Sequence, residues 1–152
     1  MPAIPVEQSL ARDQAKLVMG HLTVIAAHWE HALNYELENL RLACELAGEL
    51  TGLGLENGLG DDLRAAMART DALDRSDYDA VSVAHRALKQ IIDRVIAGDG
   101  SGAPMPPTLK CAVLRYSTVR AMRERIWHRG AGLDPDTTKL PPISSLFVRE
   151  AR

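Results

Sequence analysis

Residues 7–50 read EQSLARDQAKLVMGHLTVIAAHWEHALNYELENLRLACELAGEL, and this stretch decides the fold class. Apolar residues recur along it at spacings of three and four, the period of one face of an α-helix. The members of this first apolar face are Ala15, Val18, Leu22, Ile25, Trp29, Leu33, Leu37, Leu40, Cys44 and Ala47. The spacing predicts a single helix over residues 7–50, about 60 Å long at 1.5 Å per residue.

A second apolar stripe lies beside the first, so this helix is expected to contact two neighbours. The stripe consists of Leu17, Val24, Tyr35, Leu42, Leu46 and Leu50. Because the helix is unusually long, we expect part of it to pack against a second subunit or against the C-terminal tail.

Three loops rich in glycine or proline divide the remaining sequence, at residues 51–60, 98–107 and 130–142. Between them, helices are predicted over 61–73, after Ser76 as the capping residue, and from the capping residue Thr108 to Trp127 or His128. Gly98 is expected to end the third of these four helices. No run alternates with a period of two, so no strand is predicted. The predicted fold is an all-α four-helix bundle with a long first helix, made of residues 1–129, and a C-terminal tail or arm, residues 130–152.

Composition excludes several classes of protein. The chain has 152 residues, of which 46% are hydrophobic and 25% charged, with a net charge of −2, so the whole molecule is not a polycation built for nucleic acid. Cys44 and Cys111 are too few for a disulfide framework. No uncharged apolar run approaches the roughly 20 residues that cross a bilayer, and the N-terminal residues lack the pattern of a signal peptide. We therefore expect a cytoplasmic protein without a membrane span.

The charge is distributed unevenly along the chain. Residues 1–103 hold nine Lys or Arg and sixteen Asp or Glu, whereas residues 104–152 hold nine and four. The last helix and the residues at its end contain only one acid, Glu124, but six basic residues. The basic residues are Lys110, Arg115, Arg120, Arg123, Arg125 and Arg129. Such a helix either attracts phosphate groups or pairs with acids of the other helices.

Arg123 falls in the middle of the apolar arc of this helix, where an unpaired charge costs several kcal/mol. It therefore needs an acidic partner on the long helix, a cleft, or a subunit interface. The candidate partners are Glu36, Glu38 and Glu45. His128 follows five residues later, and Glu124, four residues before His128, is adjacent to it on the helix surface.

The run Arg123-Glu124-Arg125-Ile126-Trp127-His128, followed by Gly130, resembles the RX4–6H motif of the HEPN superfamily of small all-helical domains. The resemblance implies metal-independent RNA cleavage, with Arg123 and His128 as catalytic residues at a dimer interface, or else RNA binding by a degenerate relative of the family. Glu124 stands where the motif usually has Asn or Asp, and it either supports the His128 imidazole or pairs with Arg120, which is also four residues away. RNA would be guided by Arg120, Arg125 and Arg129. The resemblance further implies a homodimer and an antitoxin or other partner in bacterial defence.

Two alternatives remain at this stage. The first alternative to RNA cleavage is that the chain is a non-enzymatic interaction module, such as an inhibitor encoded by a phage or mobile element. The long helix would then be its docking surface. The histidines of that helix could also bind metal, given a further ligand such as His85, but packed histidines are the simpler reading. They are His21, His28 and His31. We expect no metal and no cofactor.

Overall fold

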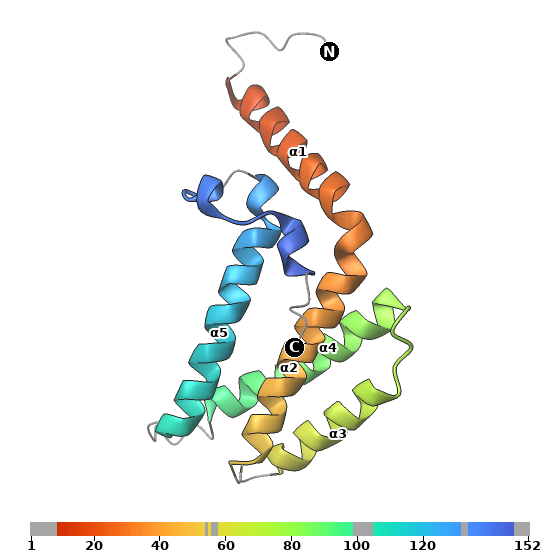
Figure 1. Ribbon diagram of the computed structural model, residues 1–152, viewed down its shortest axis with the longest axis vertical. Coiled ribbons are helices and arrows are strands. Elements are labelled where there is room, and N and C mark those ends of the chain that lie inside the picture. The colour runs from red at the N-terminus through yellow and green to blue at the C-terminus, as the bar shows by residue number, and fades with distance from the viewer. Residues whose placement is uncertain (1–8, 54, 56–57, 99–104, 132–133, 148–152) are drawn as a thin grey trace. The chain divides into compact units, whose positions relative to one another are not determined.

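The computed structural model describes residues 9–53, 55, 58–98, 105–131 and 134–147, and all regular structure among them is helical (Figure 1). The α-helices are α1 (Ser9–His28), α2 (Ala32–Thr51), α3 (Leu59–Asp71), α4 (Tyr78–Ala97) and α5 (Pro107–Trp127). The 3-10 turns are η1 (Trp29–His31), η2 (Arg129–Ala131), η3 (Thr137–Lys139) and η4 (Ile143–Leu146). The all-α prediction is confirmed. The long first helix is also confirmed, since α1, η1 and α2 follow one another without a break.

The chain forms two compact units. One comprises residues 1–31 together with 123–152, and the other residues 32–122. The prediction grouped residues 1–129 and set 130–152 apart, whereas here the C-terminal residues share a unit with α1 and the last turn of α5. Continuous helices, α5 and the run from α1 to α2, connect the two units.

The hydrophobic core lies in the unit of residues 32–122, where α2, α3 and α4 pack on one another. The side chains of Leu50, Leu63, Leu88, Ile92 and Val81 are almost fully inaccessible to solvent. The second half of the first apolar face packs into or against this core; its residues are Leu33, Leu37, Leu40, Cys44 and Ala47. Burial of this face holds α2 in place, because packing supplies most of the stability of a helix in a protein.

The helix ends follow local chemistry that the sequence predicts only in part. Gly98 ends α4 with a left-handed φ of 71°, as predicted. The predictions for the two N-termini are wrong. Asp77 is the capping residue of α4, because the Ser76 hydroxyl instead donates to Asp74 Oδ1 at 2.6 Å. Helix α5 begins at Pro107, since the fixed φ of proline suits a first helical position, and Thr108 therefore lies inside the helix.

The Asp77 carboxylate accepts a hydrogen bond from the Ala80 amide at 3.1 Å and satisfies one of the free donors of α4. We expect Asp77→Ala to lower the free energy of unfolding by about 1 kcal/mol, whereas Ser76→Ala should change it by less than about 0.5 kcal/mol. Urea unfolding followed by circular dichroism measures both. Equal losses in the two variants would contradict this assignment of the cap.

The unit of residues 1–31 and 123–152 is built differently from the unit that holds the core. Helix α1 contacts η2, and within α1, whose residues are all described, His28 is the only buried residue. Among the described helices, none combines the length and apolar character needed to cross a membrane.

Candidate functional site

The predicted catalytic pair lies at the C-terminal end of α5. Arg123 is buried, with 8% of its surface exposed, whereas the side chain of His128 is 59% exposed. The His128 amide donates to the Glu124 carbonyl at 2.9 Å, so helical bonding continues to His128. Five residues of helix turn through about 140°, so the two side chains leave the helix in different directions. One is covered by protein and the other is open to solvent.

Glu124 lies beside His128, as their spacing predicts. One oxygen of its carboxylate is 3.7 Å from His128 Nε2. This distance exceeds that of a hydrogen bond, and both side chains are substantially exposed, so the pair adds little stability.

Two of the three arginines predicted to guide RNA are held by the segment that follows α5. Arg125 donates two hydrogen bonds to the Asp134 carboxylate, at 2.7 and 3.1 Å, and these bonds lower the pKa of Asp134. Arg129 Nε donates to the Thr137 carbonyl at 3.1 Å. Arg125 thus connects Asp134 to the last turn of α5, and Arg129 connects η2 to η3, so an RNA phosphate would have to compete with those contacts.

Histidines of α1 and η1 stack on aromatic rings of the same unit. The rings of His28 and Trp127 lie 4.4 Å apart at 30°, and those of His31 and Phe147 lie 4.9 Å apart at 28°. Burial lowers the pKa of His28, and the nearby His128 and His31 lower it further. The described residues contain no group of three or more His, Cys, Asp or Glu placed to hold a metal ion. Because burial and the neighbouring histidines disfavour the charged imidazole, the packed, neutral state of His28 is favoured.

The lowered pKa of His28 predicts a pH dependence of stability. The unfolded chain binds the proton more readily than the folded one, so the free energy of unfolding falls as the pH drops below about 6.5. The loss is complete once the pH lies below the folded pKa. His28→Phe keeps a ring against Trp127 and removes the titrating group, so the wild-type loss between about pH 8 and pH 5 should shrink in this variant. Urea unfolding at both pH values measures the loss of stability in wild type and in His28→Phe. A loss that is the same in the two proteins would contradict the role given to His28.

Arg120, the third predicted RNA-binding residue, belongs to a polar network in the unit of residues 32–122. Glu36 on α2, His85 on α4 and Arg120 on α5 form a chain of contacts. The His85 Nδ1 and Glu36 Oε1 atoms are 2.8 Å apart, and Arg120 donates to His85 Nε2 at 3.3 Å. The side chains of His85 and Glu36 are only 8% and 15% exposed.

The partners in this network fix the state of each group. Burial raises the pKa of Glu36, but hydrogen bonds from His85 and Asn39 and the charge of Arg120 outweigh it, so the pKa lies below its ordinary value of 4.5. Because Arg120 donates to Nε2, the proton of a neutral His85 lies on Nδ1 and points to Glu36. Both imidazole nitrogens are thus occupied, and the network joins three helices rather than offering a free base.

The position of His85 in the sequence is a signal for this network. His85 follows Val81 by four residues and precedes Leu88 by three, so it lies on the apolar face of α4. A histidine in such a position needs polar partners on neighbouring helices when it is buried. The sequence does not say which helices supply them.

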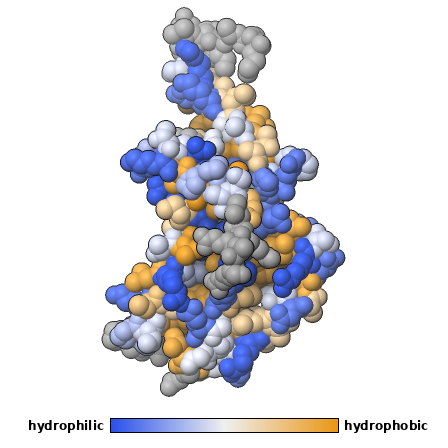
Figure 2. Space-filling model, viewed as in Figure 1, coloured by the Kyte–Doolittle hydropathy of each residue, from blue (hydrophilic) through white to orange (hydrophobic). Residues whose placement is uncertain are grey.

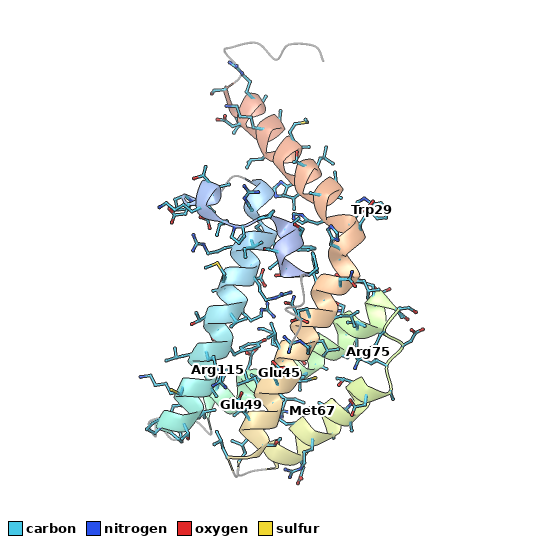
Figure 3. All side chains as sticks on the ribbon, viewed as in Figure 1. Trp29, Glu45, Glu49, Met67, Arg75 and Arg115 are labelled. Atoms are coloured by element: carbon cyan, nitrogen blue, oxygen red, sulfur yellow. The ribbon has the colours of Figure 1, made fainter. Side chains whose placement is uncertain are left out.

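A hollow of about 180 Å³ lies between α2 and α5 in the same unit. Its floor is apolar, and Arg115 pairs with Glu49 at its rim (Figure 3). The lining residues are Leu42, Glu45, Leu46, Glu49, Ala112, Arg115, Tyr116 and Val119. The volume is below the roughly 300 Å³ at which small-molecule pockets begin, so the hollow suits no sizeable ligand.

The most exposed apolar surface lies on α1 and η1. Six large apolar side chains of α1 and Trp29 of η1 are each more than half exposed; they are Leu10, Leu17, Val18, Met19, Leu22, Ile25 and Trp29. Figure 2 shows apolar surface along the part of the molecule where α1 runs, and in Figure 3 the Trp29 side chain projects outward from the ribbon.

Comparison of the chain with known protein families, characterised proteins and solved structures gave no match.

Proposed function

We propose that this protein is a helical interaction module that binds a protein partner through the exposed apolar face of α1. The observation that carries the proposal is the contrast within one apolar face. Its second half, from Leu33 to Ala47, packs into or against the core, while Val18, Leu22, Ile25 and Trp29 of its first half remain more than half exposed. Large exposed apolar patches on soluble domains mark sites of protein association.

The energetics of α1 support the same proposal. Helices in proteins depend for most of their stability on the packing of an apolar face. The 20 residues of α1 bury His28 alone, so the helix gains little from its own chain. Covering the exposed face would contribute roughly 25 cal/mol for each Å² of apolar surface removed from water. A partner on this face therefore stabilises α1 and is bound by it.

Site-specific photo-crosslinking in cells that make the protein tests this proposal. A benzophenone amino acid replaces Leu22 on the exposed face or, as a matched control, Ala27, which is also exposed and lies about 140° away around the helix. We expect one discrete covalent adduct from position 22 and none from position 27. Absence of an adduct at 22, or equal adducts from both positions, would contradict the proposal.

A second candidate function is metal-independent RNA cleavage, the activity implied by the HEPN-like motif. It is favoured by His128, which is exposed at the end of α5 with the Glu124 carboxylate 3.7 Å away. An imidazole can accept and donate protons, and a guanidinium can stabilise a charged phosphorane-like transition state. Since Arg123 is buried, this function requires its side chain to reach the phosphate through rearrangement or at a dimer interface.

Incubation of RNA with purified protein tests the second candidate. Cleavage should be lost in His128→Ala and in Arg123→Ala but retained in His21→Ala, which removes an exposed histidine of α1 that lies outside the motif. Equal cleavage by all four proteins would identify a contaminant and reject the activity.

A further inference from the structure

One line of side chains along α1 and η1 has the spacing of a coiled-coil seam. Its intervals alternate between four and three residues, and we call it the α1 seam: Ala11, Ala15, Val18, Leu22, Ile25 and Trp29. This alternation is the heptad pattern by which two helices pack side by side. The four larger members of the seam are between 54% and 66% exposed. The seam is therefore available to a second helix.

The area of this face suits a dimer of modest strength. Helix α1 is about 30 Å long, and each large exposed side chain on it presents on the order of 100 Å². The four large members of the α1 seam on each of two copies would together bury roughly 800 Å², the size of a weak, transient interface. A second helix of similar length is sufficient to cover the face.

Side-chain size changes in one direction along the α1 seam. The small residues Ala11 and Ala15 lie at its N-terminal end, and the large residues Ile25 and Trp29 lie at its C-terminal end. Parallel pairing of two copies would place Trp29 on the partner's Trp29 and leave voids between the alanines. Antiparallel pairing places a large residue against a small one at both ends, and close packing requires this complementarity.

In that antiparallel register each pair of facing positions has residue numbers that add to about 40. Val18 faces the partner's Leu22, Ala15 faces the partner's Ile25, and Ala11 faces the partner's Trp29. The arrangement is symmetric, so the same surface serves both copies, as in the commonest class of homodimer.

Charge is compatible with this arrangement. The Lys and Arg residues and the single acid of α1 are Arg12, Asp13 and Lys16. Asp13 and Lys16 pair with each other at 3.4 Å, away from the α1 seam. Arg12 flanks the seam and, in this register, is level with the partner's His28, whose lowered pKa favours the neutral imidazole. Like charges that met along the contact would oppose self-pairing, and this register brings none of Arg12, Asp13 and Lys16 onto a like charge of the partner helix.

We infer that the occupant of the α1 seam is α1 of a second copy of this chain, packed antiparallel. The inference rests on the proposed function, because it names the partner that the exposed face of α1 binds. It also accounts for the length of the first helix, whose two halves serve the core and the interface.

Disulfide trapping tests both the partner and the direction. In a background of Cys44→Ser and Cys111→Ser, three single-cysteine proteins are prepared: Ala15→Cys, Ile25→Cys and, as a control on the outer side of α1, Ala27→Cys. Circular dichroism confirms that each one folds. The antiparallel dimer predicts a disulfide only when Ala15→Cys and Ile25→Cys are mixed, with linked peptides that join position 15 to position 25.

Each other outcome has a definite meaning. Disulfides within Ala15→Cys alone and within Ile25→Cys alone would show parallel pairing and overturn the inference. No disulfide in any mixture, together with a position-22 photo-adduct to a different protein, would reject the second copy and leave the proposed function standing. Absence of both the disulfide and the adduct would reject both proposals.

Discussion

Replacing His85 by leucine is expected to lower the free energy of unfolding by about 3 kcal/mol, because it removes the 2.8 Å contact of the largely buried Glu36 carboxylate with His85 Nδ1. Glu36→Leu should cost a similar amount, since it removes the carboxylate that His85 contacts and that Arg120 stabilises by its charge. Removal of one partner from a buried ionic pair typically costs about 3–5 kcal/mol, whereas apolar replacement of the whole pair is much less harmful. The loss therefore reflects an orphaned charge more than a lost attraction.

The double variant Glu36→Leu/His85→Leu distinguishes this account from simple loss of packing. If the network is coupled, the double variant should lose about as much stability as the worse single variant, so the two effects are far from additive. Urea unfolding of the four proteins at neutral pH measures this coupling. Single losses below about 1 kcal/mol that add in the double variant would contradict the network.

The variant Leu22→Glu/Ile25→Glu is expected to abolish self-association. Each copy would carry two carboxylates into an apolar contact, and burial of an unpaired charge costs several kcal/mol. Since 1.4 kcal/mol corresponds to a factor of ten, the Kd for association should rise at least about 100-fold. Sedimentation equilibrium over a concentration series measures this change.

A single-charge comparison controls for the added charge. Ala27→Glu places one carboxylate on the outer side of α1 and should leave the Kd close to that of the wild type, whereas Leu22→Glu alone should raise it. Equal sedimentation of wild type, Leu22→Glu and Ala27→Glu would reject the contact.

The sequence was sufficient to predict where the helices run and which residues form their apolar faces. The spacing from Ala15 to Ala47 predicted a continuous helical segment, and the structure contains it with a 3-10 turn at Trp29–His31. Local backbone chemistry was predictable at Gly98 but not at Ser76. There, Asp74 and Asp77 offered competing hydrogen bonds within three residues.

Periodicity could not predict what covers each part of a face. Val18 and Leu40 belong to the same spacing pattern, yet Leu40 is buried and Val18 is more than half exposed. The difference depends on which helices fold back onto the long one, and that depends on contacts distant in sequence. For the same reason the sequence placed Arg123 on an apolar arc but could not predict that His128, five residues later, would be exposed.

Hydrogen exchange of the α1 backbone tests the central claim most directly. If the exposed face of α1 binds a second copy, amides within residues 13–27 should be protected at high protein concentration, lose protection on dilution, and be unprotected in Leu22→Glu/Ile25→Glu at every concentration. Protection of those amides that is the same at all concentrations and in that variant would contradict the claim, because α1 would then be stabilised by its own chain.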